Sequence, residues 1–191
     1  MLSTPENSDR INSKCRGFLL YNRVIIPDYK CANRIYWNGY YGSFLGVQKP
    51  RKQDIRAPLE LSLIEALYLI EKGVIEVWSG NRKISSEELL SRGQKLIENF
   101  DTLYRVYRDL RERGFVIRRG LKFGCDYLLY KYGPGIDHAP FGVEVVRAED
   151  VYDPIAIVRM GRLLHSVRKK LILAITSNEK IDYYLFSWWK P

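Results

Sequence analysis

The pattern of hydrophobic and polar positions predicts short strands that alternate with helices. In the run RGFLLYNRVIIPD, which begins at Arg16, aromatic and β-branched residues predict strand structure that ends at Pro27. The run from Asn33 to Asp54 holds further short aromatic stretches, which glycines and a proline interrupt. The first well-marked helix is predicted only after this run.

Capping residues mark that helix and the one after it. In LSLIEALYLIEKG, Ser62 and Glu65 form a capping box, apolar positions recur at helical spacing, and Gly73 supplies the stop. The following VIEVW predicts a strand. Ser85 and Glu88 then repeat the capping-box spacing at the start of a second helical pattern.

This second helical pattern runs on to Gly114, which is longer than a typical globular helix. Gly93 and Asn99 interrupt it and therefore suggest a connecting segment. We accordingly predict a domain boundary near residue 90, with one domain over residues 1–90 and a second over residues 91–191.

The second half of the chain is predicted to be rich in strands. FVIRRG and CDYLLYKYG are β-rich runs around a glycine turn, and FGVEVV forms a third strand. A basic helix follows, which Asp153 and Pro154 start as N-cap and first helical residue. LILAIT and IDYYLFSWW are the last predicted strands, joined by SNEK.

Composition supports a globular protein. The chain has 191 residues, of which 46% are apolar, so it can bury a sizeable core. Its first residues are polar, and no segment approaches the roughly 20 uninterrupted apolar residues of a membrane span. We therefore expect neither signal peptide nor membrane anchor, and a cytoplasmic protein.

The number and spacing of the cysteines also favour a cytoplasmic protein. Cys15, Cys31 and Cys125 are odd in number and widely spaced, without the paired spacing of a zinc site. We expect three reduced thiols that pack as small hydrophobic side chains.

Charge indicates the kind of partner. The chain carries 31 Lys and Arg against 22 Asp and Glu, a net charge of +9, which favours polyanions. IAIVRMGRLLHSVRKK, from Ile155 to Lys170, holds five of these cations and no acid. An ordinary solvated helix face usually mixes both signs, so an anionic ligand is the favoured interpretation of this helix.

The loop KYGPGIDHAPFG concentrates glycines and prolines around His138. Such residues fix unusual backbone angles, which is costly unless the imidazole must point in a particular direction. Taken alone, the loop is better explained as an ordinary turn between two strands. Its neighbours favour a site, because Tyr130 ends the strand before the loop and Lys169 lies on the basic helix after it.

A phenol, an imidazole and an ammonium group together can cleave RNA without a metal. RNA carries its own nucleophile, the 2′-hydroxyl, so an enzyme supplies a base, an acid for the 5′-oxygen and a cation for the phosphorane. His138 suits the acid and Lys169 the cation. Tyr130 is mostly neutral at its reference pKa near 10, and as a base it needs cations nearby, which residues 168–170 could supply.

GLKFGCDYLLYKYGPGIDHAPFGVEVV together with RLLHSVRKKLILAI resembles the catalytic domain of the archaeal tRNA-splicing endonucleases. KFGCDYLLY, GIDHAPF and SVRKKLILA stand in that family's order and spacing, and LSLIEALYLIEKGVIEVW resembles its N-terminal domain more loosely. The resemblance implies an α/β (α+β) fold: a small N-terminal α/β domain and a nuclease-like domain whose mixed sheet is flanked by helices.

The resemblance also implies an activity and its residues. The activity is cleavage of precursor tRNA at bulge-helix-bulge junctions, without metal or cofactor, leaving a 2′,3′-cyclic phosphate and a 5′-hydroxyl. The family's catalytic residues fall on Tyr130, His138 and Lys169, with Tyr132 a second candidate for the tyrosine. Two scissile bonds require two active sites, so we expect a homo-oligomer or an α2β2 complex with a non-catalytic paralogue.

RNA contacts are expected in three places. Arg162 matches the first of two arginines that hold a flipped bulge base in the family, and we place it on one helix face with Lys169. The second arginine has no match, and Trp188, in the last strand, is a candidate for base stacking, although a core or interface role is the stronger alternative. The basic loop with Lys49, Arg51 and Lys52 is either an RNA contact or a solvated loop.

Three further interpretations stay open. SNEKID resembles an acidic loop that docks in a partner's basic pocket. The chain is alternatively a non-cleaving RNA-binding or structural subunit. It is alternatively a metal-dependent nuclease of similar fold, with Asp126 or Glu144 as ligands.

Overall fold

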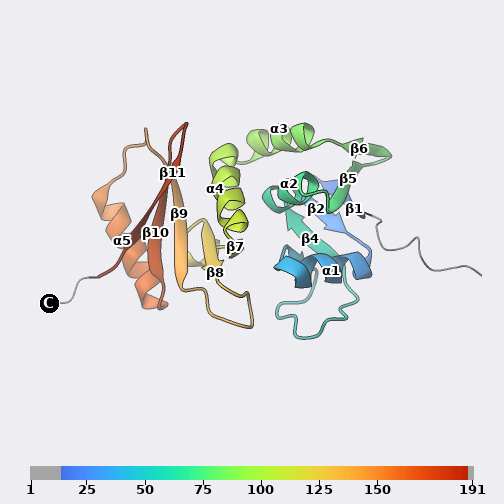
Figure 1. The fold of residues 1–191 in the computed structure, drawn as a ribbon, viewed down its shortest axis with the longest axis horizontal. Coiled ribbons are helices and arrows are strands. Elements are labelled where there is room, and N and C mark those ends of the chain that lie inside the picture. The colour runs from blue at the N-terminus through green and yellow to red at the C-terminus, as the bar shows by residue number, and fades with distance from the viewer. Residues whose placement is uncertain (1–13, 189–191) are drawn as a thin grey trace, which may run out of the picture.

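The computed structural model describes residues 14–188, which form two mixed sheets with helices between and beside them (Figure 1). The first sheet has the strand order β3-β4-β2-β1-β5-β6, in which β1 and β5 run parallel and every other neighbouring pair is antiparallel. Its strands are β1 Cys15–Leu20, β2 Arg23–Ile26, β3 Ser43–Phe44, β4 Leu59–Ser62, β5 Ile75–Ser79 and β6 Arg82–Ile84. Helices α1 (Tyr29–Gly39) and α2 (Leu63–Glu71) belong to this part of the chain.

The second sheet has the order β11-β10-β9-β8-β7, in which only β9 and β10 run parallel. Its strands are β7 Val116–Arg119, β8 Tyr127–Tyr130, β9 Phe141–Arg147, β10 Lys170–Thr176 and β11 Ile181–Phe186, with a 3-10 turn η1 at Leu121–Phe123. Helix α5 (Pro154–Ser166) covers one face, and α4 (Phe100–Glu112) packs on the other, between the two sheets (Figure 1). The mixed α/β fold class predicted from the sequence is confirmed.

Helix α3 (Ser86–Leu96) and α4 divide the long helical pattern. Asn99, with φ of 54°, interrupts it as predicted. Gly93 does not interrupt it: this residue lies inside α3, where the ring of Phe100 occupies the space that a β-carbon would need. The glycine therefore permits close packing of α4 against α3. The core of buried apolar side chains continues through Leu89 and Phe100, and a domain boundary near residue 90 stays a prediction.

Helix α1 was not identified from the sequence. Asp28 caps it by accepting a hydrogen bond from the backbone N–H of Cys31 at 2.7 Å. Ile35 and Tyr36 are buried against the first sheet. Aromatic residues favour strands in isolation, so here tertiary burial outweighed local propensity.

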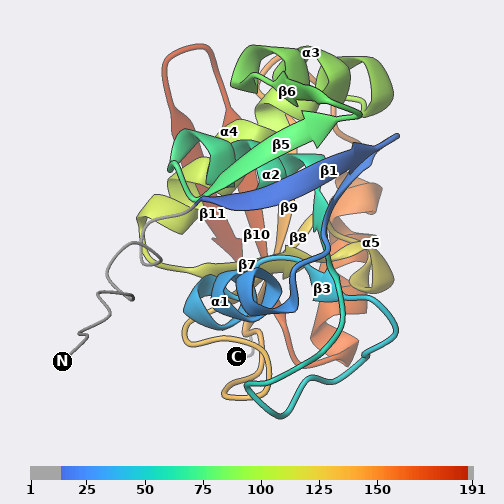
Figure 2. The same ribbon diagram turned by 90° about the vertical axis from the view of Figure 1, so that its right-hand side faces the viewer.

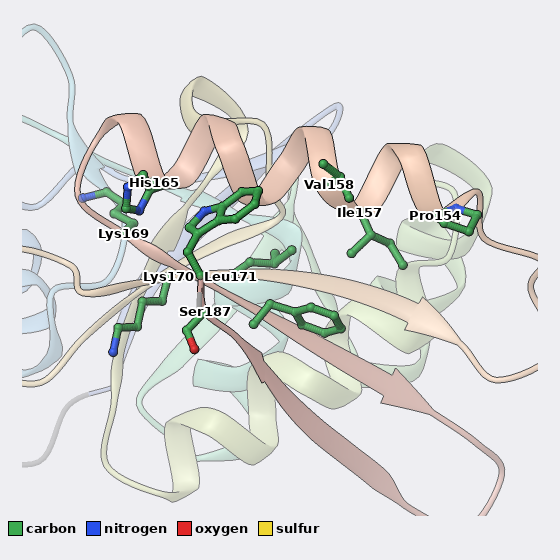
Figure 3. Close-up of a pocket in the computed structure, with 11 residues that line it drawn as sticks. Pro154, Ile157, Val158, His165, Lys169, Lys170, Leu171 and Ser187 are labelled. Atoms are coloured by element: carbon green, nitrogen blue, oxygen red, sulfur yellow. The ribbon is translucent and has the colours of Figure 1, made fainter. Parts of the chain in front are cut away.

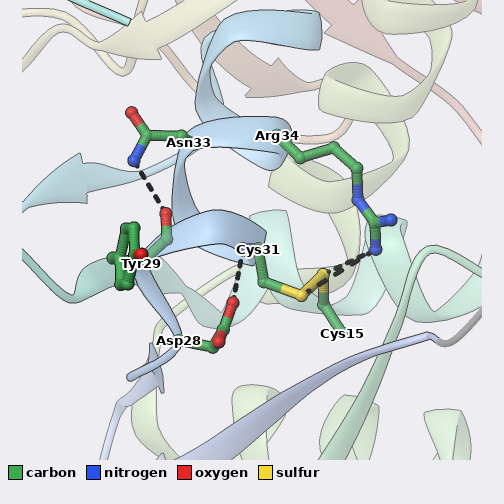
Figure 4. The surroundings of a disulfide bond; sticks show 6 residues. All are labelled: Cys15, Asp28, Tyr29, Cys31, Asn33 and Arg34. Carbon is green, nitrogen blue, oxygen red and sulfur yellow. Dashed lines mark hydrogen bonds between the residues drawn. A yellow bond between two sulfur atoms is a disulfide. The ribbon is translucent and has the colours of Figure 1, made fainter. Parts of the chain in front are cut away.

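The prediction of three reduced thiols is wrong. Cys15 at the start of β1 and Cys31 in the first turn of α1 form a disulfide, with 5.7 Å between their α-carbons (Figure 4). The Arg34 guanidinium lies 2.9 Å from the Cys15 sulfur. The fold brings together two thiols that are 16 residues apart, which their spacing in the sequence could not reveal. Cys125 alone behaves as expected, because burial raises the pKa of its thiol to about 12.

The described residues also bear on membrane association. No helix among residues 14–188 has the length and apolar character that crossing a membrane requires.

Candidate catalytic site

Tyr130 is the last residue of β8 and pairs with Val116 on β7. Its half-buried ring packs against a small apolar cluster that includes Leu128, Ala139 and Leu164. Burial raises the pKa of the phenol, the positive charge of Arg118 opposes this rise, and the negative charge of Asp137 adds to it. The cation that favours the phenolate is thus Arg118 on β7, whereas the sequence had pointed to residues 168–170.

The loop after Tyr130 is organised around the carboxylate of Asp137. This group accepts hydrogen bonds from the backbone N–H groups of Lys131, Tyr132 and Gly133, at 3.0, 3.3 and 2.7 Å. Positive φ angles at Gly133 (130°) and Gly135 (88°) make the chain curl around it, a conformation that glycine adopts without steric cost. The exposed His138 follows directly on this fixed turn, so the expected stiffening around the imidazole is present.

Lys169 lies beyond the end of α5, not on the helix as predicted. The helix ends at Ser166, and Arg168, with φ of 58°, reverses the chain before β10 begins at Lys170. The Lys169 ammonium donates a hydrogen bond to the carbonyl oxygen of Ala139 at 3.0 Å. The ammonium is therefore held beside the residue that follows His138.

Parallel pairing of β9 and β10 produces this proximity. The backbone N–H of Lys170 bonds to the carbonyl oxygen of Pro140 at 3.0 Å, so the two strands begin side by side. Ala139 lies in the same apolar cluster as Tyr130. The three predicted catalytic residues thus come from neighbouring ends of β8, β9 and β10.

A cavity of about 610 Å³ opens between α5 and the end of β11 (Figure 3). Its walls are largely apolar, and His165 and Lys169 lie together at one end of it. Trp188 lies beyond the end of β11 at Phe186, not in the last strand as predicted. The residue is 48% exposed, and its ring centroid lies 6.3 Å from that of His165, edge to face. Trp188 is thus a wall of a cavity that reaches the predicted catalytic lysine, a placement that leaves both stacking and interface roles open.

Arg162 is exposed on α5. Because Lys169 follows the helix, the predicted sharing of one helix face by these two residues is wrong. Lys49, Arg51 and Lys52 are exposed in the loop between β3 and β4. That loop and the His138 loop both lie toward the lower end of the molecule in the two views (Figures 1 and 2).

Two residues around the site were missed by the sequence analysis. Asp137 could have been found, since an aspartate inside a Gly/Pro loop commonly bonds nearby backbone N–H groups. Arg118 could not, because nothing in the strand pattern of FVIRRG tells which arginine turns toward Tyr130.

The carboxylates considered as metal ligands lie on and beside β9. Burial and the charge of Asp126 raise the pKa of Glu144 to about 7, and burial also raises the pKa of Asp126. The Asp126 carboxylate accepts a hydrogen bond from the Val145 N–H at 2.8 Å. Within residues 14–188, no group of three or more His, Cys, Asp or Glu side chains is arranged to hold a metal ion.

Comparison with known proteins covers nearly the whole chain. The family model for the tRNA intron endonuclease catalytic C-terminal domain matches residues 100–183, and that for the N-terminal domain matches residues 15–90. A tRNA-splicing endonuclease of Hyperthermus butylicus is 48% identical over 92% of this chain and 99% of its own length.

Two further tRNA-splicing endonucleases show the same relationship. The protein of Sulfolobus acidocaldarius is 44% identical, and that of Saccharolobus islandicus is 42% identical, each over 92% of this chain and 98% of its own length. All three organisms are crenarchaea. The chain belongs to the tRNA intron endonuclease family.

Proposed function

We propose that the chain is the catalytic subunit of a tRNA-splicing endonuclease that cuts precursor tRNA at bulge-helix-bulge junctions. The observation that carries the proposal is the hydrogen bond from Lys169 to Ala139, because it places the Lys169 ammonium beside the residue that follows His138. Family membership supports the substrate, and the net charge of +9 supports a polyanion.

In the proposed reaction, Tyr130 removes the proton of the 2′-hydroxyl at the cleavage site. The 2′-oxygen forms a bond to phosphorus, Lys169 stabilises the charge on the phosphorane, and the bond to the 5′-oxygen breaks. His138 gives its proton to the leaving 5′-oxygen. The products are a 2′,3′-cyclic phosphate and a 5′-hydroxyl, and no metal ion takes part.

Substrate binding is proposed to use the exposed cations. Arg162 holds a bulge base, since a guanidinium plane stacks on a base where an ammonium cannot. Lys49, Arg51 and Lys52 contact phosphates from their loop, and Trp188 offers a further stacking surface.

Assembly is proposed to follow from the two scissile bonds, as an α2β2 complex with a paralogous subunit or as a homo-oligomer. The loop before β11 was expected to dock through its acids. In the structure Asp182 lies in β11, not in the loop as expected, and forms an ion pair with Lys180 at 2.9 Å, so Glu179 is the acid that the loop itself offers for such docking.

The test is incubation with a bulge-helix-bulge RNA in EDTA, with and without a candidate paralogous subunit, followed by analysis of the ends. We expect cyclic phosphate ends in EDTA and no cleavage when the nucleotide at the cut is 2′-deoxy. Cleavage of the deoxy RNA would overturn 2′-hydroxyl attack. Loss of activity in EDTA would favour a metal-dependent nuclease using Asp126 or Glu144, and inactivity of the complex would favour a non-cleaving subunit.

A further inference from the structure

The turn between α1 and β3, residues 39–43, is held against the second sheet by two arginines of that sheet and its helix. Arg118 on β7 donates hydrogen bonds to the carbonyl oxygens of Tyr40, at 2.7 Å, and Gly42, and to the Ser43 hydroxyl at 2.8 Å. The buried Arg111 on α4 donates to the carbonyl oxygen of Gly39 at 2.8 Å. Most carbonyl groups of this turn are thus bound by guanidinium groups.

The same turn is also held from its own side. The buried carboxylate of Glu65 on α2 accepts a hydrogen bond from the Gly42 N–H at 2.8 Å, as well as bonds from the N–H and hydroxyl of Ser62. Gly42 has φ of 69°, and a β-carbon there would lie 2.5 Å from the carbonyl oxygen of Glu60. The turn is therefore hydrogen-bonded on both sides and closely packed at Gly42.

Tyr40 extends from this fixed turn to the loop that carries His138. A β-carbon on Gly133 would lie 2.4 to 2.9 Å from atoms of the Tyr40 ring, so the ring lies directly against the backbone of Gly133. Gly133 also donates to Asp137, the residue before His138. One chain of contacts thus runs from Arg118 through Tyr40 and Gly133 to the catalytic loop.

We propose that Arg118 and Tyr40 are positioning residues for RNA cleavage: Arg118 fixes the α1–β3 turn, and Tyr40 on that turn sets the position of the His138 loop. The proposal rests on the proposed function. It gives the N-terminal part of the chain a direct role in the geometry of the active site. The pKa of Tyr130 agrees with it, since the charge of Arg118 opposes the increase that burial produces.

The experiment uses the full chain in its active assembly and measures single-turnover cleavage and binding of precursor tRNA separately. We expect Arg118→Met to slow cleavage on the order of tenfold to a hundredfold, a typical cost of misplacing reacting groups, with binding nearly unchanged. Arg119→Met is the matched control, because Arg119 lines the same cleft beside Gly42 and Ser43, whereas the hydrogen bonds from β7 to the turn come from Arg118. It removes the same charge and should cleave like the parent.

A pH profile separates positioning from a purely structural role. The charged or titratable groups near Tyr130 are Arg118 on β7, Asp137 in the loop and Tyr36 on α1. Without Arg118 the pKa of Tyr130 rises further, so the limb on which the rate increases with pH should move to higher pH. Arg118→Lys restores the charge and should return this limb toward its parental position.

A second substitution covers the case in which Arg118→Met does not fold. Tyr40 has φ of 55°, a conformation that asparagine tolerates, so Tyr40→Asn removes the ring without straining the turn. We expect cleavage about tenfold slower with binding retained. Tyr21→Asn is its control, since Tyr21 also has positive φ, at 46°, but is 69% exposed in the turn after β1.

The results decide between three cases. If the parent fails to cleave, the proposed function is wrong. If the parent cleaves and the folded Tyr40→Asn and Arg118→Met chains cleave at the rates of their controls, the positioning role is wrong. If Arg118→Met loses binding while the cleavage rate of bound RNA is unchanged, Arg118 is an RNA contact, which also overturns the proposal.

Discussion

The His138 loop and the α1–β3 turn meet at Tyr40, yet they are stabilised in opposite ways. The loop is largely exposed, and one carboxylate, that of Asp137, accepts three of its backbone N–H groups, beside backbone bonds to Gly133 and the Lys169 bond to Ala139. The turn is held by Arg111, Arg118 and Glu65, of which Arg111 and Glu65 are buried.

The difference shows how a catalytic group can stay open to a large substrate and still be held in place. An exposed loop cannot bury enough surface to become rigid on its own. Here it packs against a neighbouring turn, most of whose carbonyl groups are hydrogen-bonded to arginines.

The largest effect is expected from the loop chemistry. His138→Ala removes the proton for the 5′-oxygen, and general acid groups typically contribute 10²–10⁴-fold to a rate. A substrate with a 5′-thio leaving group needs little protonation, so it should restore cleavage by His138→Ala in a single-turnover assay.

Lys169→Ala is the comparison for that experiment. This substitution removes the cation that stabilises the phosphorane, and it leaves the Ala139 carbonyl without its hydrogen-bond donor. A 5′-thio leaving group compensates for neither change. Equal rescue of both variants would remove the acid role from His138.

The next largest effect is expected from removing the disulfide, which joins β1 to the helix that leads into the α1–β3 turn. Replacing Cys15 and Cys31 by serine frees the start of α1 from β1, which should lower the free energy of unfolding by about 2–4 kcal/mol. Thermal or chemical denaturation measures this. Cleavage at a temperature well below the transition should change little, because Arg111 and Arg118 still hold the far end of α1.

The parent treated with a reductant should match the double serine variant. A reduced parent as stable as the oxidised protein would show that the cross-link does not support the fold.

Glu65→Gln should have the smallest effect, about 1–3 kcal/mol of stability, the usual cost of leaving buried donors unsatisfied. Burial by itself would raise the pKa of Glu65, but the charge of Arg118 and hydrogen bonds from Ser62 and Gly42 outweigh it, so the pKa is lowered. A carboxylate with a lowered folded pKa stabilises the protein above its unfolded pKa of about 4.3. This stability is lost as the pH falls through the folded pKa.

Denaturation at several pH values checks this sign. The difference in stability between parent and Glu65→Gln should be largest near neutral pH and should shrink as the solution becomes acidic. A difference that grows toward acid pH would mean that the pKa of Glu65 is raised rather than lowered.

Local signals in the sequence located most elements but not all. Capping boxes at Ser62 and Ser85 placed the starts of α2 and α3, because the cap and its partner are three residues apart. Helix α1 begins without a capping box, and its aromatic residues favour strand structure, so it was not predicted. The end of α5 was also misjudged: Arg168 takes a left-handed conformation that its residue type does not announce.

The sequence by itself predicted the alternation of strands and helices from its periodicity, and the resemblance of its motifs to a known family indicated the fold class and the candidate catalytic residues. Only the tertiary structure decided which distant groups meet: Cys15 with Cys31, Lys169 with Ala139, and Arg118 with the turn that supports Gly133. The physical reason is that such contacts join residues between 16 and 78 positions apart. Strand order and packing set their distances, and no local pattern in the chain encodes them.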